Sequence, residues 1–573
     1  MEVENLRAPG VHGVSFAVRA GEILGITGLV GAGKTELAHA LYGVTQPLAG
    51  TIRLGGVARQ ICHPHQAVQL GMYMIPEERR QQGVFVDESC TVNLSITDDS
   101  RWVRKARVKA LARDLAEQVR LVTSSLDKPV RWLSGGNQQK VSLGKWIGLK
   151  GQVFIFDEPT KGIDVGAKTE IYRLMTALAK RGAAILLISS EIEEVLGMSD
   201  RLLVLYQGTV AAEYNADVSE HEVLKMATGE DISVSVNIEA EWGGQRQLTW
   251  GKFLERYGTL IFILLVIVFF AVTCPGFLTA ANFSDIIRSI TITTFIALGV
   301  TFSLAVNGFD LSIGSVASFS GALAAGLMVW NRQLTLVAVL VPLVAGLAVG
   351  ILNALLIVYL RLPDILATLA TLFVVQGLQL TYSQGTNIYS NMPMANGTTA
   401  PGVILKSFMA LSQGSLWHIP IPLFLLVLGA GLAHWFLTYT RAGRNMYAIG
   451  GNELAAYLTG IRVKRYKALA YILSGGFAAF GGVLLTARLG AGETLAGSPY
   501  LLDAVTATYI GLSVFGIGKP NAIGTLVGAF FLGVILNGAT MLNISYTAQD
   551  IFKGIVLVVA LIFSYTQKTR RLA

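Results

Sequence analysis

A stretch of 184 residues, 257–440, contains seven charged side chains, and this scarcity constrains the fold more than any other feature of the sequence. The seven are Asp285, Arg288, Asp310, Arg332, Arg361, Asp364 and Lys406. A soluble domain of that length carries many more charges on its surface, so we expect this part of the chain to lie in a membrane. The whole chain of 573 residues agrees: 52% are hydrophobic and 14% charged, and the mean hydropathy is +0.54.

Apolar runs long enough to cross or nearly cross a bilayer predict about ten membrane spans. They lie near 257–277, 286–306, 313–330, 334–360, 364–382, 421–439, 468–487, 503–517, 520–541 and 550–566. Basic residues collect on the cytoplasmic side of membrane proteins. With the N-terminus inside, ten spans place Arg361, Arg441, the Arg462–Lys467 cluster and the Lys568–Arg571 tail on that side.

Residues 1–232 have a different character, because charged residues occur throughout them. Short apolar runs such as Val153–Phe156 alternate with amphipathic segments such as Gly166–Lys180. This alternation predicts an α/β nucleotide-binding domain, joined by a polar linker at 233–250 to an all-α membrane domain at 251–573. Met1–Gly10 has no basic and apolar leader pattern, so we expect the first domain to stay in the cytosol.

Residues 28–35 read Gly-Leu-Val-Gly-Ala-Gly-Lys-Thr and follow a strand-like run, as a phosphate-binding loop does. The glycines let main-chain N–H groups curl around phosphates, Lys34 can neutralise the β and γ groups, and Thr35 can bind Mg²⁺. The glycines of the pattern are Gly28, Gly31 and Gly33. The other interpretation of such a sequence is an ordinary glycine-rich turn.

The apolar run Val153–Phe156 ends in two acids, Asp157 and Glu158. Placed beside a phosphate loop, Asp157 would hold Mg²⁺ through water and Glu158 would orient the attacking water. Two solvated acids at a strand end are the alternative, and the phosphate loop upstream argues against it.

Between these segments, Leu133–Lys140 reads Leu-Ser-Gly-Gly-Asn-Gln-Gln-Lys and resembles the signature motif of ATP-binding-cassette (ABC) proteins. The resemblance implies that two such ATPase domains close face to face. Each ATP would then lie between one phosphate loop and the Ser134, Gly135 and Gly136 of the other domain. Asp164 matches the loop of the family that crosses this interface.

Two positions depart from the usual ABC pattern. Ser190 stands where the family has a switch histidine, and Glu77 stands where a glutamine contacts Mg²⁺ and the permease. Both departures resemble the second ATPase half of bacterial monosaccharide importers, whose two unequal halves normally share one chain. We therefore expect the chain to work with a second copy of itself or with a separate ATPase chain.

The membrane part resembles the permease subunits of ribose-type importers over essentially all of 250–573. The similarity is carried by Gly308–Ser315, which reads Gly-Phe-Asp-Leu-Ser-Ile-Gly-Ser, and by Gly450–Glu453 followed by Thr459–Ile461. The second motif falls in a cytosolic connection, where a helix would dock on the ATPase and couple it to the pathway. A basic loop facing lipid is the alternative.

Four polar residues in or near the spans are candidates for contact with a sugar. Asp310 is either a functional acid or a helix N-cap at the bilayer edge. Gln376, Gln379 and Asn537 either bond to sugar hydroxyls or join neighbouring helices.

Taken together, these features predict ATP-driven import of a monosaccharide across the bacterial inner membrane, with ATP and Mg²⁺ as cofactors and a periplasmic sugar-binding protein as partner. An exporter and a non-transporting regulatory protein are the competing hypotheses. The net charge of +8 fits a membrane protein better than a nucleic-acid-binding one. The three cysteines, Cys62, Cys90 and Cys274, have neither disulfide nor metal-ligand spacing.

Overall fold

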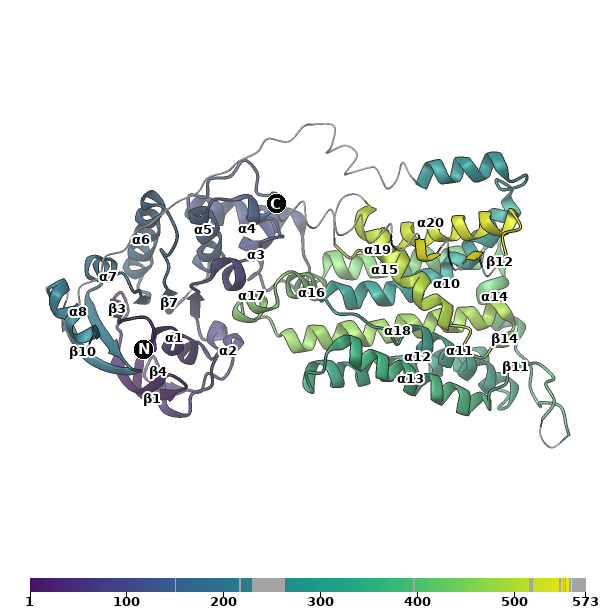
Figure 1. Cartoon of the computed structure of the whole chain (residues 1–573), viewed down its shortest axis with the longest axis horizontal. Coiled ribbons are helices and arrows are strands. Elements are labelled where there is room, and N and C mark those ends of the chain that lie inside the picture. The colour runs from purple at the N-terminus through teal and green to yellow at the C-terminus, as the bar shows by residue number, and fades with distance from the viewer. Residues whose placement is uncertain are drawn as a thin grey trace. The chain divides into compact units, whose positions relative to one another are not determined.

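The computed structural model describes residues 1–149, 151–215, 218–228, 263–394, 397–514, 519–545, 548–549, 551, 553–555 and 558. The chain forms two compact units (Figure 1). Unit 1 comprises Met1–Trp242 and Gly451–Val463, and unit 2 comprises Gly243–Gly450 and Lys464–Ala573. The expected linker, 233–250, lies outside the described residues. Segment 451–463, which the sequence places between two membrane spans, thus belongs to the unit that holds the phosphate loop.

Unit 1 is built on a six-stranded sheet with the order β10-β9-β3-β8-β7-β6. All neighbouring strands are parallel except β10, which pairs antiparallel with β9. Their bounds are β3 Ile23–Thr27, β6 Met72–Ile75, β7 Val153–Asp157, β8 Ala184–Ile188, β9 Arg201–Tyr206 and β10 Thr209–Asn215. Strands β3, β6, β7 and β8 are buried along their whole length, as strands covered on both faces are.

A second, antiparallel sheet has the order β2-β1-β4-β5. Its strands are β1 Glu2–Ala8, β2 Val11–Ala17, β4 Ala49–Leu54 and β5 Val57–Arg59. The helical segments of unit 1 are α1 Lys34–Tyr42, α2 Pro64–Gln69, the π-helical turn η1 Arg79–Gly83, α3 Cys90–Ser95, α4 Lys105–Gln118, the 3₁₀ turn η2 Val130–Trp132, α5 Gly135–Ile147, α6 Val165–Lys180, α7 Ile192–Met198, α8 Glu220–Thr228 and α17 Glu453–Leu458.

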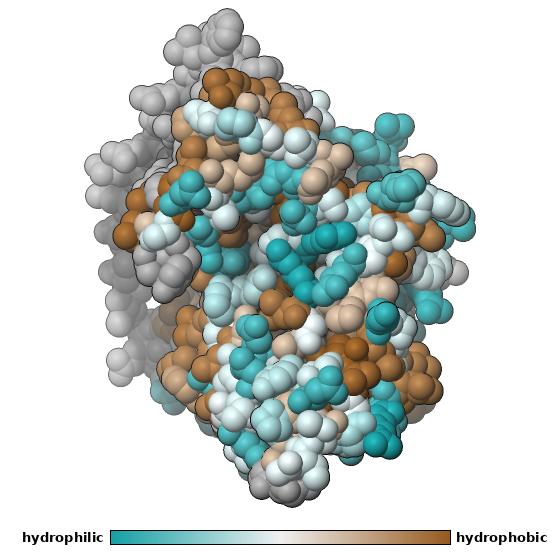
Figure 2. Space-filling model, turned by 90° about the vertical axis from the view of Figure 1, so that its right-hand side faces the viewer, coloured by the Kyte–Doolittle hydropathy of each residue, from teal (hydrophilic) through white to brown (hydrophobic). Residues whose placement is uncertain are grey.

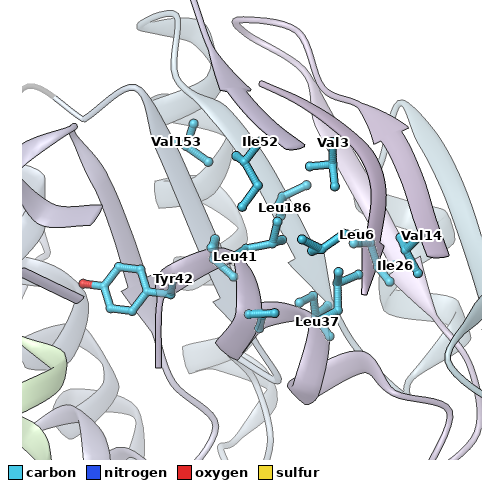
Figure 3. Close-up of a cluster of buried hydrophobic side chains, with 14 of the residues drawn as sticks. Val3, Leu6, Val14, Ile26, Leu37, Leu41, Tyr42, Ile52, Val153 and Leu186 are labelled. Atoms are coloured by element: carbon cyan, nitrogen blue, oxygen red, sulfur yellow. The ribbon is translucent and has the colours of Figure 1, made fainter. Parts of the chain in front are cut away.

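The largest core of unit 1 lies between α1 and side chains from both sheets (Figure 3). Leu37 and Leu41 of α1 point into it beside Leu6 and Leu186, whereas the hydroxyl of Tyr42 points away from the cluster. Leu458 of α17 is buried in this same core, 5% exposed. A residue 416 positions after Tyr42 therefore helps to fill the interior of the nucleotide-binding fold.

Unit 2 is helical. Its helices are an apolar segment Ile263–Thr273, α10 Ala280–Ala305, α11 Ile313–Val329, α12 Thr335–Ala354 with the π-helical turn η3 Leu355–Tyr359, α13 Asp364–Ser383, α14 Lys406–Gln413, α15 Ile421–Tyr439, α16 Arg441–Gly451, α18 Val463–Leu489, α19 Ser498–Ser513 and α20 Ala522–Met541. Short β-pairs join β11 Ile388–Tyr389 to β14 Ala491–Gly492 and β12 Ser415–Leu416 to β13 Ile419–Pro420.

Six helices in the described part of unit 2 are long and apolar enough to cross a membrane. They are α10, α12 with η3, α13, α15, α18 and α20, while α11 and Ile263–Thr273 are shorter apolar helices. The predicted count of ten is not confirmed, and most of the tenth predicted span, 550–566, lies outside the described residues. The face of the molecule shown in Figure 2 has hydrophilic side chains across its centre and hydrophobic ones nearer its margins.

Candidate functional site

The loop from Gly28 to Gly33 needs glycine at its two ends for steric reasons. Gly28 has φ +153° and Gly33 φ +93°. A Cβ on Gly28 would lie 2.4 Å from the carbonyl oxygen of Leu205, and one on Gly33 would lie 2.5 Å from that of Gly10. Gly31 also has a positive φ, +86°, but open space around its Cα. The loop is thus held tightly against two neighbouring segments and enters α1 at Lys34, where the free main-chain N–H groups of a helix start can bind an anion.

Lys34 and Thr35 bring the first turn of α1 to the end of β7. The Lys34 ammonium donates hydrogen bonds to the carbonyl of Gly28 at 2.5 Å and to Oγ of Ser190 at 2.7 Å. The Thr35 hydroxyl lies 3.4 Å from Oδ1 of Asp157. A hydroxyl beside a buried carboxylate at a phosphate loop is the donor set that Mg²⁺ takes when it also binds nucleotide phosphates.

Glu158 follows directly and has a left-handed backbone, φ +46°. Its Oε1 accepts hydrogen bonds from the main-chain N–H of Ser190 at 2.8 Å and from the Ser190 hydroxyl at 2.6 Å. The same Oε1 lies 3.9 Å from the Lys34 ammonium. Ser190, the second residue after β8, therefore connects the lysine of the phosphate loop to the acid that follows β7.

The charges of the site reflect its burial. Burial, reinforced by the negative charges of Glu77 and Glu158, raises the pKa of Asp157 to about 7. Burial also lowers the pKa of Lys34, although the charge of Glu158 opposes the shift. Carboxylates gathered in this way favour a divalent cation among them, so the residues present fit Mg²⁺.

Of the other predicted residues, Glu77 lies near Asp157, whereas Asp164 and the signature residues lie at the starts of α6 and α5. Oε1 of Glu77 accepts a hydrogen bond from the Lys161 ammonium at 2.6 Å, and its charge raises the pKa of Asp157. Asp164 is the N-cap of α6, because its Oδ1 accepts a hydrogen bond from Ala167 N at 2.9 Å. Ser134 is the N-cap position of α5, which begins at Gly135, and Gly136 packs against Ala167 of α6.

The structure also brings segment 451–463 onto unit 1 through side chains to which sequence reasoning gave no role. The Tyr42 hydroxyl donates to the carbonyl of Leu458 at 2.9 Å, which explains its outward direction in Figure 3. The buried Nζ of Lys145 donates to the carbonyl of Gly83 at 2.6 Å and to Oγ1 of Thr459 at 3.3 Å. A ring nitrogen of His65 lies 2.8 Å from the carbonyl of Gly460. Tyr42, His65 and Lys145 stand in no motif, so their contacts left no signal in the sequence.

Asp310 lies in the non-helical link between α10 and α11 and is fully buried. Its Oδ1 accepts hydrogen bonds from Ser312 N at 3.0 Å and from the Ser312 hydroxyl at 2.6 Å. Its Oδ2 accepts one from Ser474 of α18 at 2.7 Å. Asn353 of α12 donates to Oδ1 at 3.4 Å. The carboxylate therefore ties the start of α11 to two other helices.

The three other sugar-contact candidates lie on α13 and α20. Asn537 donates to Oδ1 of Asn282 on α10 at 2.8 Å, which is an interhelical bond. Gln379 is fully buried, and among the described residues neither of its amide atoms has a hydrogen-bond partner. Gln376 is half-buried on α13. The described contacts do not bring Asp310, Gln379 and Asn537 together into one site.

Comparison with known proteins identifies both parts of the chain. Residues 11–161 match the family described as ABC transporter, and residues 282–561 match the family described as branched-chain amino acid transport system / permease component. The chain joins an ABC ATPase domain to a permease domain. It is thus a membrane protein.

Curated relatives resemble the ABC ATPase domain. A ribose import ATP-binding protein RbsA of Jannaschia sp. is 46% identical over 222 residues, which cover 38% of this chain and 43% of the relative. The RbsA of Lactococcus lactis subsp. cremoris is 39% identical over 234 residues, which cover 40% and 48%. The chain thus spans less than half the length of these relatives. A solved ATP-binding subunit of an ABC transporter matches 40% of the chain at 23% identity and a TM-score of 0.35.

Proposed function

We propose that this chain couples ATP hydrolysis to the import of a monosaccharide, ribose or a related sugar, across the bacterial inner membrane. The observation that carries the coupling is the place of segment 451–463, which follows permease helix α16 in the chain and supplies Leu458 to the core of the ATPase unit. A segment that follows a permease helix and completes the ATPase fold cannot move independently of that fold. The ATPase domain would lie on the cytoplasmic side.

The residues of the site divide the work of hydrolysis. Lys34 and the main-chain N–H groups of the Gly28–Gly33 loop bind the β and γ phosphates. Thr35 and Asp157 would hold Mg²⁺, which neutralises phosphate charge when it is bound. Glu158 orients the attacking water and accepts its proton, and Ser190 fixes the carboxylate of Glu158 in place.

Two signals about the substrate differ. The permease family is described in terms of branched-chain amino acids, whereas the relatives are named for ribose import. We favour a sugar because the relatives share 39–46% identity with the ATPase domain. For assembly we propose a second copy of this chain or a separate ATPase chain, together with a periplasmic sugar-binding protein.

Uptake into right-side-out inner-membrane vesicles, with the binding protein supplied outside, tests the proposal. Labelled ribose and labelled leucine are supplied outside in parallel, and ATP is enclosed inside, where the ATPase domain would lie. We expect ribose uptake that depends on ATP and is lost in Glu158→Gln, a change that keeps the shape of the side chain but removes the base. Leucine uptake, or export of a lipophilic dye, would contradict the sugar-import proposal.

A further inference from the structure

One side chain of segment 451–463 donates hydrogen bonds to main-chain carbonyls of the turn η1, Arg79–Gly83, and of the residue that follows it. Asn452 Nδ2 donates to the carbonyls of Arg80, Gln81 and Val84 at 3.3, 3.0 and 3.2 Å. The other amide atom, Oδ1, accepts from Ala455 N at 3.0 Å and caps α17. One amide thus fixes both the start of α17 and the position of the turn.

The side chain of Arg79 leaves the same turn and reaches the loop after Glu158. Its Nη1 donates to the carbonyl of Lys161 at 2.9 Å, and its Nη2 donates to the carbonyl of Gly162 at 3.2 Å. A Cβ on Gly135 would lie 2.8 Å from Nη2. The guanidinium therefore lies between loop 161–164 and the first residue of the signature helix α5.

A second contact joins the same two segments. The Lys161 ammonium donates to Oε1 of Glu77 at 2.6 Å, two residues before Arg79. Residues 77–79 thus hold Lys161 by both its main chain and its side chain. A planar guanidinium satisfies two neighbouring carbonyls at once, which a lysine ammonium on a flexible stem does less well.

We propose that Arg79 is a positioning residue that ties loop 161–164 to turn η1, so that the place of this loop depends on Asn452. The contacts run in series: Asn452 bonds to the turn, and the turn bonds to the loop through Arg79. The inference gives a role in coupling only if the proposed function holds, because loop 161–164 contains Asp164 of the expected ATP interface.

Trypsin measures the linkage without any assay of transport. It cuts after Lys161, whose carbonyl Arg79 binds, and the exposed bond after Arg181 in the same unit serves as reference. The full-length protein in detergent is digested without nucleotide, and the first cuts are timed by mass spectrometry. We expect Arg79→Ala and Asn452→Ser each to raise the rate of cleavage after Lys161 at least several-fold and to leave the rate of cleavage after Arg181 unchanged.

Asn452→Ser is the informative variant because serine keeps the N-cap of α17 but is too short to reach the carbonyls of the turn. Arg80→Ala is the matched control, since the Arg80 side chain bonds to Gln138 on α5 and not to loop 161–164. If trypsin cuts Asn452→Ser after Lys161 at the same rate as the unmodified protein, the linkage is overturned. If trypsin also cuts Arg79→Ala at that rate, the positioning role is overturned as well.

ATP hydrolysis separates positioning from loss of fold. We expect Arg79→Ala to lower kcat about tenfold while the half-saturating ATP concentration changes by less than about twofold, because Arg79 does not bond to the phosphate loop. Arg79→Lys should recover part of the rate. Equal effects on both constants would contradict positioning. Absence of hydrolysis by the unmodified protein would contradict the proposed function, and the trypsin result would still decide this inference.

Discussion

Ser190 contacts Glu158 with two of its own atoms, the main-chain nitrogen and the side-chain hydroxyl. Its hydroxyl oxygen also accepts a hydrogen bond from the Lys34 ammonium. A histidine at this position would be large enough to reach a phosphate, whereas serine stays beside the acid. The replacement therefore supports the orientation of Glu158, and under the proposed function contact with the γ-phosphate would fall to Lys34 and the loop.

Removal of this hydroxyl tests the interpretation. Ser190→Ala keeps the main-chain bond to Glu158 but loses the shorter side-chain bond, and we expect kcat for ATP hydrolysis to fall about tenfold, equivalent to about 1.4 kcal/mol. Ser190→Thr retains the hydroxyl and should stay within about threefold of the unmodified rate, about 0.7 kcal/mol. Phosphate release at saturating ATP measures both. An alanine variant as active as the threonine variant would show that the hydroxyl has no role.

Lys145 gives a prediction about pH. Burial lowers its pKa from 10.5 to about 7, so between these values the unfolded chain binds a proton that the folded chain does not. Stability therefore rises with pH across this window, by at most about 1.4 kcal/mol per pH unit. We expect the melting temperature of the full chain, relative to that of Lys145→Met, to increase between pH 7.5 and pH 9.5. A constant difference between the two proteins would contradict a neutral buried lysine.

The sequence pattern singled out residues that the structure brings together at the phosphate loop, but not the ones that join this group to the rest of the unit. Two short contiguous patterns mark these residues: the loop from Gly28 to Thr35, and the adjacent acids Asp157 and Glu158. Such patterns can be recognised in a sequence. Arg79 was visible only as one basic residue next to another. Its partners are the main-chain carbonyls of Lys161 and Gly162. Because every residue has such a carbonyl, the sequence does not show which ones accept a hydrogen bond from Arg79.

At the scale of single elements, the phosphate loop shows two different demands for glycine. Gly31 needs only its positive φ, whereas Gly33 also lacks room for a Cβ. We expect Gly31→Ala to cost about 1–2 kcal/mol of stability and Gly33→Ala to cost more than about 3 kcal/mol. Thermal melting and binding of a fluorescent ATP analogue measure the two effects. Equal losses would mean that the approach to the Gly10 carbonyl is relieved by movement of the loop.

Asp310, in the link between α10 and α11, has two competing hypotheses that substitution can separate. Four donor groups surround its carboxylate, and Asp310→Asn would turn an NH₂ group towards some of them, leaving buried donors unpaired at about 1–3 kcal/mol each. A structural role predicts a lower melting temperature in detergent for Asp310→Asn and a smaller decrease for Ser474→Ala. Unchanged melting with complete loss of sugar uptake would instead favour a functional acid.

The membrane helices were predicted less well than the ATPase fold. Long apolar runs marked α12, α15 and α20 within a few residues, because hydropathy and length suffice there. The predicted run 313–330 also matches α11, although this helix is too short for the length criterion. In contrast, α19 begins at Ser498 and ends at Ser513, whereas the predicted run was 503–517. The bounds of α19 depend on the neighbours that cover it, and hydropathy alone contains no such information.

For the whole molecule, the resemblance to ABC proteins implies that an ATP site needs two domains. A chain with Lys34→Ala and a chain with Ser134→Asp should each be inactive as purified. Mixed dimers isolated through two different tags should regain roughly half of the unmodified ATPase activity, because one of the two interfaces is intact. No recovery, with the mass of a dimer confirmed, would contradict shared sites. A complex whose mass includes another ATPase chain would identify that chain as the partner.

Leu458 and Tyr42 join two parts of unit 1 that lie 416 positions apart in the chain. A gene split at 233–250 would yield a first polypeptide whose core lacks the Leu458 side chain and whose Tyr42 hydroxyl has lost its acceptor. The second polypeptide would carry the missing piece on a loop. Two separately translated parts should therefore find each other without a linker, and an ATPase fragment made alone should tend to aggregate through the gap that Leu458 normally closes.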